Sequence, residues 1–110
     1  MTETRKTESK ICPTIEYAFA MLGKKWTGLI IHVLGDAPTR FSELLKEVPS
    51  LSSRLLAERL RELECEGIVI RRVIPEKPVK VEYILTEKGR SLIPIMQSLA
   101  DWAYRWYEST

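Results

Sequence analysis

The chain has 110 residues, of which 45% are hydrophobic and 29% charged, a composition typical of one soluble globular domain. The formal net charge of +2 is too small to predict a nucleic-acid partner, so the clustering of charges matters more than their sum. No apolar run approaches the roughly 20 residues that span a bilayer, and the polar opening MTETRKTESK is not a secretory signal. We therefore expect no membrane partner.

Two cysteines without a framework spacing favour reduced thiols and a cytoplasmic location. Apart from Met1, residues 1–10 are polar or charged, and we expect a flexible N-terminal tail there. Apolar positions are spread evenly over the rest of the chain, which predicts a single domain over residues 11–108.

The first helix is predicted over residues 12–22, because Pro13 suits the first helical position and Gly23 follows the last apolar residue. A second, very apolar helix is expected over residues 25–34, where Gly35 ends it.

Residues 36–40 have the composition of a turn, and a short third helix is predicted over residues 41–48, before Pro49. A serine at position 52 or 53 then caps a fourth helix, which stops at Gly67. The turn between these two helices is short, as a helix-turn-helix motif requires.

The β-branched runs IVIRRVI and VKVEYIL predict two strands of a hairpin with PEKP at its tip. One long last helix is expected over residues 86–108, with Thr86 as its cap and a bend at Gly89 and Pro94. The predicted fold class is mainly α with a small β-hairpin, in the order of a winged helix-turn-helix domain.

The fourth helix has two distinct faces at 100° per residue. The core face carries Leu56, Leu60 and Leu63, widened by Leu55. The opposite face carries Arg54, Glu58, Arg61 and Cys65.

Charge changes sign along this helix, from arginines near its start to three glutamates after Arg61. If the N-terminal end enters a major groove, its arginines meet base edges or phosphates, and the acidic end points away. Those glutamates are unfavourable for the helix dipole, so helix stability does not explain them. The alternative is a solvated amphipathic helix with salt bridges.

Residues 71–80 of the hairpin are basic, because Glu76 is their only acid against Arg71, Arg72, Lys77 and Lys80. Such a tip can contact phosphates or a minor groove along a duplex. Edge lysines also deter aggregation, so the hairpin by itself is weak evidence. A basic helix followed by a basic hairpin favours DNA binding more strongly.

Five motifs occur in order: an N-terminal Cys-Pro, Gly-Lys-x-Trp, Arg-Phe-x-Glu-Leu, the Leu-x-x-Arg-Leu-x-x-Leu spacing, and Tyr-x-Leu-Thr-x-x-Gly. With these motifs, residues 12–106 resemble the HxlR family of bacterial winged-helix transcription regulators, dimeric relatives of the MarR type. The similarity is greatest to the thiol-based branch that represses quinone- and aldehyde-detoxifying genes. The resemblance implies a homodimer, a repressor, and a sensor cysteine at Cys12.

Some members of that branch form a disulfide with a C-terminal cysteine of the partner subunit. This chain ends in YRWYEST, without such a cysteine, so the resemblance does not extend to that disulfide.

Cys12 also has a chemical argument of its own, because it precedes Pro13 at a helix N-terminus, where backbone N–H groups and the dipole favour a thiolate. Lys10, Lys24 or Lys25 could add to this effect. A thiolate is alkylated by quinones and other electrophiles, and oxidants convert it to sulfenic acid. The alternative is a small buried hydrophobic residue.

Cys65 is a candidate second thiol, although no base-rich neighbourhood favours its thiolate. His32 fits a hydrogen-bonded helix residue better than a metal ligand. Cys12, His32 and Cys65 lack the short spacings of zinc ligands, so we expect no metal site and no cofactor.

The last helix is apolar around most of its circumference, which indicates a second subunit as cover. Its aromatic residues could instead clamp the first two helices. The expected dimer contacts are Ile15, Phe19, Leu99, Trp102, Ala103 and Trp106.

The sequence thus predicts a homodimeric regulator that binds double-stranded DNA at a pseudo-palindromic operator, with an electrophile or oxidant as inducer. Modification of Cys12 would shift the first helix against the last and change the distance between recognition helices. The predicted DNA contacts are Arg40, Ser52, Ser53, Arg54, Ala57, Glu58, Arg61, Arg72, Lys77 and Lys80. Two alternatives are a winged-helix protein-interaction module without DNA binding and a thiol peroxidase. The enzyme lacks a partner constellation around Cys12.

Overall fold

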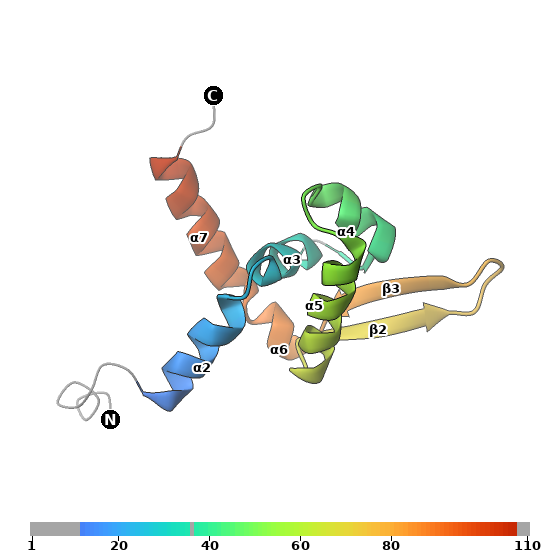
Figure 1. Ribbon diagram of the computed structural model, residues 1–110, viewed down its shortest axis with the longest axis horizontal. Helices are drawn as coiled ribbons and strands as arrows, with labels where there is room; N and C mark the ends of the chain where they lie inside the picture. Colours follow the sequence, from blue (N-terminus) through green and yellow to red (C-terminus); the bar gives the residue numbers. More distant parts are fainter. Residues whose placement is uncertain (1–11, 36, 108–110) are drawn as a thin grey trace.

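The computed structural model describes residues 12–35 and 37–107 and contains helices around a small antiparallel sheet (Figure 1). The predicted tail, residues 1–10, lies outside the described residues, as do Ile11 and Glu108 of the predicted domain. In chain order the elements are α2 Pro13–Leu22, α3 Thr27–Leu34, β1 Thr39–Arg40, α4 Phe41–Glu47, α5 Ser53–Cys65, β2 Val69–Ile74, β3 Lys80–Leu85, α6 Glu87–Arg90 and α7 Ile93–Trp106.

The predicted start and end of the fourth helix are confirmed in α5. The Ser52 hydroxyl accepts a hydrogen bond from the Leu55 backbone N–H at 3.1 Å, which satisfies one of the free donors of the first turn. Gly67 follows the helix with a φ of 75°, a left-handed backbone that glycine adopts without a steric cost. This positive φ explains why the helix ends where it does.

The sheet has three strands and not the two that the sequence predicts. Strand β1 pairs with β3 on the side opposite β2, and Arg40 lies across from Glu82. Its two residues lie in the segment predicted as a turn. A strand this short has no alternating pattern to detect, and β3 supplies its hydrogen bonds from more than forty residues further along the chain.

The single last helix of the prediction is two helices, α6 and α7, with the break at Ser91–Leu92. Pro94 lies in the first turn of α7, where its missing N–H is harmless. Gly89 has a packing role instead, because a Cβ at this position would meet the Ile68 carbonyl oxygen at 2.3 Å. Close contact with the sheet, and not bending, requires this glycine.

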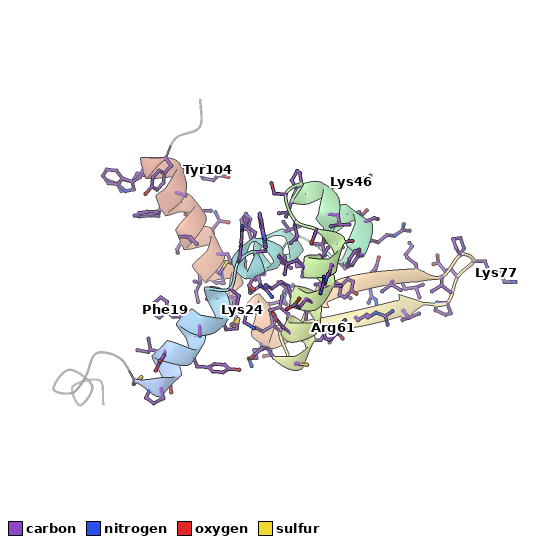
Figure 2. All side chains as sticks on the ribbon, viewed as in Figure 1. Phe19, Lys24, Lys46, Arg61, Lys77 and Tyr104 are labelled. Atoms are coloured by element: carbon purple, nitrogen blue, oxygen red, sulfur yellow. The ribbon has the colours of Figure 1, made fainter. Side chains whose placement is uncertain are left out.

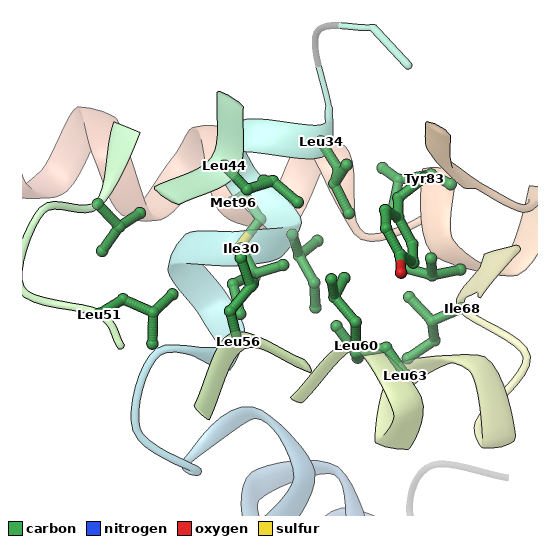
Figure 3. Packing of buried hydrophobic residues seen from close by; sticks show 14 residues of the cluster. Ile30, Leu34, Leu44, Leu51, Leu56, Leu60, Leu63, Ile68, Tyr83 and Met96 are labelled. Carbon is green, nitrogen blue, oxygen red and sulfur yellow. The ribbon is translucent and has the colours of Figure 1, made fainter. Parts of the chain in front are cut away.

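The core lies where α3, α4 and α5 meet the sheet, and Figure 3 shows its side chains. Its most buried members are Ile30, Ile31, Leu44, Leu56, Leu60, Leu63, Ile68 and Val69. The predicted leucine face of the fourth helix is therefore confirmed. This packing fixes α5 on the body and leaves its opposite face exposed.

Helices α2 and α7 project from one side of the body and diverge, while the β2–β3 hairpin projects from the other side (Figure 1). No residue of α2 is buried, and Met96 is the only buried residue of α7. Among the helices within the described residues, none is long and apolar enough to cross a membrane.

Candidate nucleic-acid interface

The outward face of α5 carries the predicted recognition residues. Ser53, Arg54, Glu58 and Arg61 are exposed, and Ala57 is half-buried between them. Figure 2 shows Arg61 on this face of the helix. The structure therefore brings a serine, two arginines and a glutamate onto one surface that none of the other described elements covers.

Arg59 belongs to a different surface from Arg54 and Arg61. Its side chain is only 14% exposed, its Nε donates to the Lys25 carbonyl oxygen at 2.9 Å, and its Nη1 lies 3.2 Å from Glu62. It ties α5 to the turn between α2 and α3. Of the three arginines in α5, Arg54 and Arg61 alone face outward.

The predicted DNA contacts of the hairpin differ in their exposure and in their pairing with acids. Lys77 is exposed at the tip, well separated from Arg61 (Figure 2), and Lys80 is half-buried at the start of β3. Arg72 lies opposite Glu82 on β3, and its Nη2 is 2.9 Å from the Glu82 carboxylate. This ion pair lowers the charge that Arg72 can offer to a phosphate.

Arg40, another predicted DNA contact, is exposed and lies on the other side of Glu82 from Arg72. Its backbone N–H donates to the Glu43 carboxylate at 3.0 Å, so its position caps α4. Ser52 is exposed, and its hydroxyl caps α5 while keeping a proton to donate. Both residues therefore have a structural role independent of DNA.

The acidic end of α5 has a role that the sequence analysis missed. Glu62 lies 3.2 Å from the Lys24 Nζ, and the Glu66 carboxylate accepts a hydrogen bond from the Tyr17 hydroxyl. Lys88 donates to the Glu66 carbonyl oxygen at 2.7 Å. Pointing away from DNA is thus an incomplete explanation of these glutamates, because Glu66 holds α2 and Glu62 holds the turn that follows it.

Cys12 is the N-cap residue of α2, as predicted, and it is half-buried. Its side chain makes no cap hydrogen bond with the described residues. Two of the three lysines that were expected to favour a Cys12 thiolate do not lie beside it. Lys24 and Lys25 lie beyond the opposite end of α2, with Lys24 on Glu62 and Lys25 over the Trp26 ring, and Lys10 lies outside the described residues.

Cys65 is an exposed free thiol at the last position of α5, between two glutamates. His32 is exposed on α3, and its side chain makes no hydrogen bond to a described residue, so its expected hydrogen bond stays a prediction. Within the described residues, no three histidine, cysteine or acidic side chains form a group that could hold a metal ion.

The predicted dimer residues form exposed apolar surfaces on α2 and α7. The exposed fractions are 74% for Phe19, 57% for Leu99, 51% for Trp102 and 64% for Trp106. Ile15 is also exposed, and Ala103 is half-buried. Leu99 and Ala103 line a groove of about 470 Å³ between α3 and α7. The aromatic residues do not clamp the first two helices of their own chain.

The three-stranded sheet, the buried face of α5 and its outward arginines define a winged helix-turn-helix regulator of the DNA-binding class. The model of the HxlR-like helix-turn-helix family matches residues 21–110. The chain belongs to the HxlR family, which confirms the resemblance inferred from its motifs. It is a transcriptional regulator and not an enzyme, as are the relatives that it matches.

Two regulators are similar to this chain in both sequence and structure. The HTH-type transcriptional regulator YodB of Bacillus subtilis (strain 168) is 53% identical over 98 residues, 89% of this chain and 88% of YodB. The structure of reduced YodB matches with a TM-score of 0.77 and 53% identity, covering 89% of this chain and 96% of that one. The redox regulator HypR in its reduced form matches with a TM-score of 0.80 and 39% identity, covering 86% and 94%. YodB has also been solved after diamide treatment and with bound quinone.

Proposed function

We propose that this protein is a homodimeric repressor that leaves its operator when Cys12 is modified by an electrophile such as a quinone. The observation that carries the proposal is the pair of outward arginines on α5 in a fold shared with YodB. The expected place of action is the cytoplasm, where DNA and reduced thiols occur together.

In this proposal, the first turns of α5 enter the major groove. Arg54 and Arg61 are the donors best suited to guanine edges, and Ser53, Ala57 and Glu58 lie beside them on the same exposed face. Lys77 and Lys80 hold phosphates or the minor groove, together with Arg40 and Ser52. Arg72 contributes less, because Glu82 already pairs with it.

A second copy of the chain supplies the cover for α2 and α7. Large apolar residues exposed on projecting helices are typical of subunit interfaces, and two-fold dimers are the commonest arrangement. The dimer would place two α5 helices in successive major grooves, about 34–36 Å apart, on a pseudo-palindromic operator.

Quinone addition to Cys12 needs no further reactant. The thiolate sulfur bonds to a ring carbon, and the displaced electron pair moves to a quinone oxygen, which takes up the thiol's proton. The attacked ring carbon then loses its own proton to the second oxygen as the ring becomes aromatic, which gives a thioether hydroquinone without any net oxidant. The adduct would enlarge the half-buried N-cap of α2 and displace that helix. Cys65 is not required for this reaction.

The test is operator release measured by fluorescence anisotropy, on a duplex selected from a random pool, with one equivalent of p-benzoquinone per chain. The wild-type protein and the Cys65→Ser control should both be released. The Cys12→Ser protein should stay bound. Release of Cys12→Ser as readily as wild type would show that Cys12 is not the sensor.

A further inference from the structure

Helix α2 has two opposite faces with different surroundings. At 100° per residue, Ile15 and Phe19 point to one side and Tyr17 points to the other, while Lys24 lies in the turn that follows α2. Figure 2 shows Phe19 directed away from the body. Before its last turn, α2 is therefore attached to its own protomer through the face of Tyr17, and the turn after the helix adds Lys24.

That second face and the turn after α2 are joined to α5 by polar contacts. The Tyr17 hydroxyl donates to the Glu66 carboxylate, and the Lys24 Nζ lies 3.2 Å from Glu62. Glu62 and Glu66 are one helical turn apart, so they form one row on α5. Arg59 completes the group, since it contacts Glu62 and the Lys25 carbonyl oxygen. We call Tyr17, Lys24, Arg59, Glu62 and Glu66 the α2–α5 clamp.

Close apolar packing does not replace these contacts along α2. A cleft of about 230 Å³ lies between the helices, with Tyr17, Ala20, Lys24, Glu62 and Glu66 in its lining. The α2 side chains that reach the core, Met21 and Leu22, are half-buried and belong to its last turn. The N-terminal part of α2, which begins at Cys12, thus depends on Tyr17 for its contact with α5.

The hydrogen bond to Glu66 and, after it, the negative charge of that carboxylate raise the pKa of Tyr17 above its ordinary value. The hydroxyl therefore remains a protonated donor throughout the neutral range, and as the pH rises the donor is lost only above the ordinary tyrosine pKa of about 10. The Tyr17 hydroxyl can consequently donate to Glu66 at the pH at which the regulator would bind DNA.

We propose that the α2–α5 clamp transmits the state of Cys12 to the recognition helix within one subunit. When its contacts are formed, the clamp holds α2 against the C-terminal half of α5, and this is the operator-binding form. Displacement of α2 after modification of Cys12 opens it and releases α5 from that position. This inference rests on the proposed function and names the positioning residues through which the same site acts.

The test is a double-mutant cycle of Tyr17→Phe, Glu66→Ala and the double variant, with operator affinity measured before and after p-benzoquinone treatment. Each single variant should weaken operator binding of the untreated protein by about three- to tenfold and reduce the effect of quinone by a similar factor. The double variant should be no weaker than either single variant, because the two groups share one contact. Additive losses, or wild-type behaviour of Tyr17→Phe, would overturn the proposal.

Hydrogen exchange of residues 13–22 separates this proposal from the sensor proposal, because it requires neither DNA nor quinone. Exchange should be faster in untreated Tyr17→Phe than in wild type. A Tyr104→Phe control, which removes a hydroxyl with no hydrogen bond to the described residues, should exchange as wild type does.

If quinone fails to release the wild-type protein, the sensor proposal fails. Faster exchange and weaker untreated binding of Tyr17→Phe would then still support the clamp. If quinone releases the wild-type protein and Tyr17→Phe exchanges at the wild-type rate, the clamp proposal alone fails.

Discussion

Arg54, Arg59 and Arg61 lie within two turns of one helix, yet burial gives them different roles. Arg59 is mostly buried, donates a hydrogen bond to the Lys25 carbonyl oxygen and forms an ion pair with Glu62. Arg54 and Arg61, in contrast, are exposed. A guanidinium with free N–H groups can bind a guanine edge in bidentate geometry, and one already committed to protein acceptors cannot. The sequence shows three similar arginines, and only the fold separates them.

Replacing Arg61 should test this division at the level of one side chain. Arg61→Ala should cost about 1–3 kcal/mol of operator affinity and weaken the preference for the selected sequence. Gel-shift titration against selected and scrambled duplexes gives both quantities. Arg90→Ala, which removes an exposed arginine from α6, should leave both unchanged. Equal affinities of Arg61→Ala and wild type would remove this residue from the interface.

Lys80 should behave differently, because a lysine on the hairpin neutralises phosphate charge without reading bases. Lys80→Ala should weaken selected and scrambled duplexes alike and lower the slope of log affinity against log salt by about 1. Titrations at several salt concentrations measure that slope. A change of sequence preference with an unchanged slope would contradict a phosphate contact.

Among the elements, those specified by local chemistry were predicted well. A serine cap, three spaced leucines and a terminal glycine define α5, and β-branched runs define β2 and β3. Strand β1 could not be predicted, because Thr39 and Arg40 become a strand only through pairing with β3.

The contacts of α2 could not be predicted for a similar reason. Tyr17 lies on α2 and Lys24 in the turn after it, and neither position indicates the partner of its side chain. Glu62 and Glu66 lie about forty or more residues further along the chain and meet them only after folding. Polar contacts over such separations leave no periodic signal in one sequence.

The close approach of Gly89 to the Ile68 carbonyl oxygen can be tested through the stability of the fold. Gly89→Ala should destabilise the fold by about 1–3 kcal/mol, because the added Cβ overlaps the Ile68 carbonyl oxygen. Gly28→Ala is the matched control, since nothing lies within 4 Å of its added Cβ inside α3, and it should be neutral or stabilising. Urea unfolding measures both free energies. Equal stability of Gly89→Ala and wild type would contradict the close contact.

For the whole molecule, the two proposed surfaces lie on opposite sides of the core. The hairpin projects from one side, and the exposed apolar residues of α2 and α7 occupy the helices that project from the other (Figure 1). Dimerisation through α2 and α7 would therefore leave both α5 helices free for DNA. In the same arrangement, one face of α2 would contact the partner subunit, and the opposite face carries the contact of Tyr17 with α5.

Sedimentation equilibrium of the protein on its selected duplex tests the central claim most directly, when combined with hydroxyl-radical footprinting of the same complex. The account predicts two chains per duplex, with two protected half-sites centred one helical turn apart, about 10–10.5 base pairs. One chain bound with full affinity to a single half-site would contradict it.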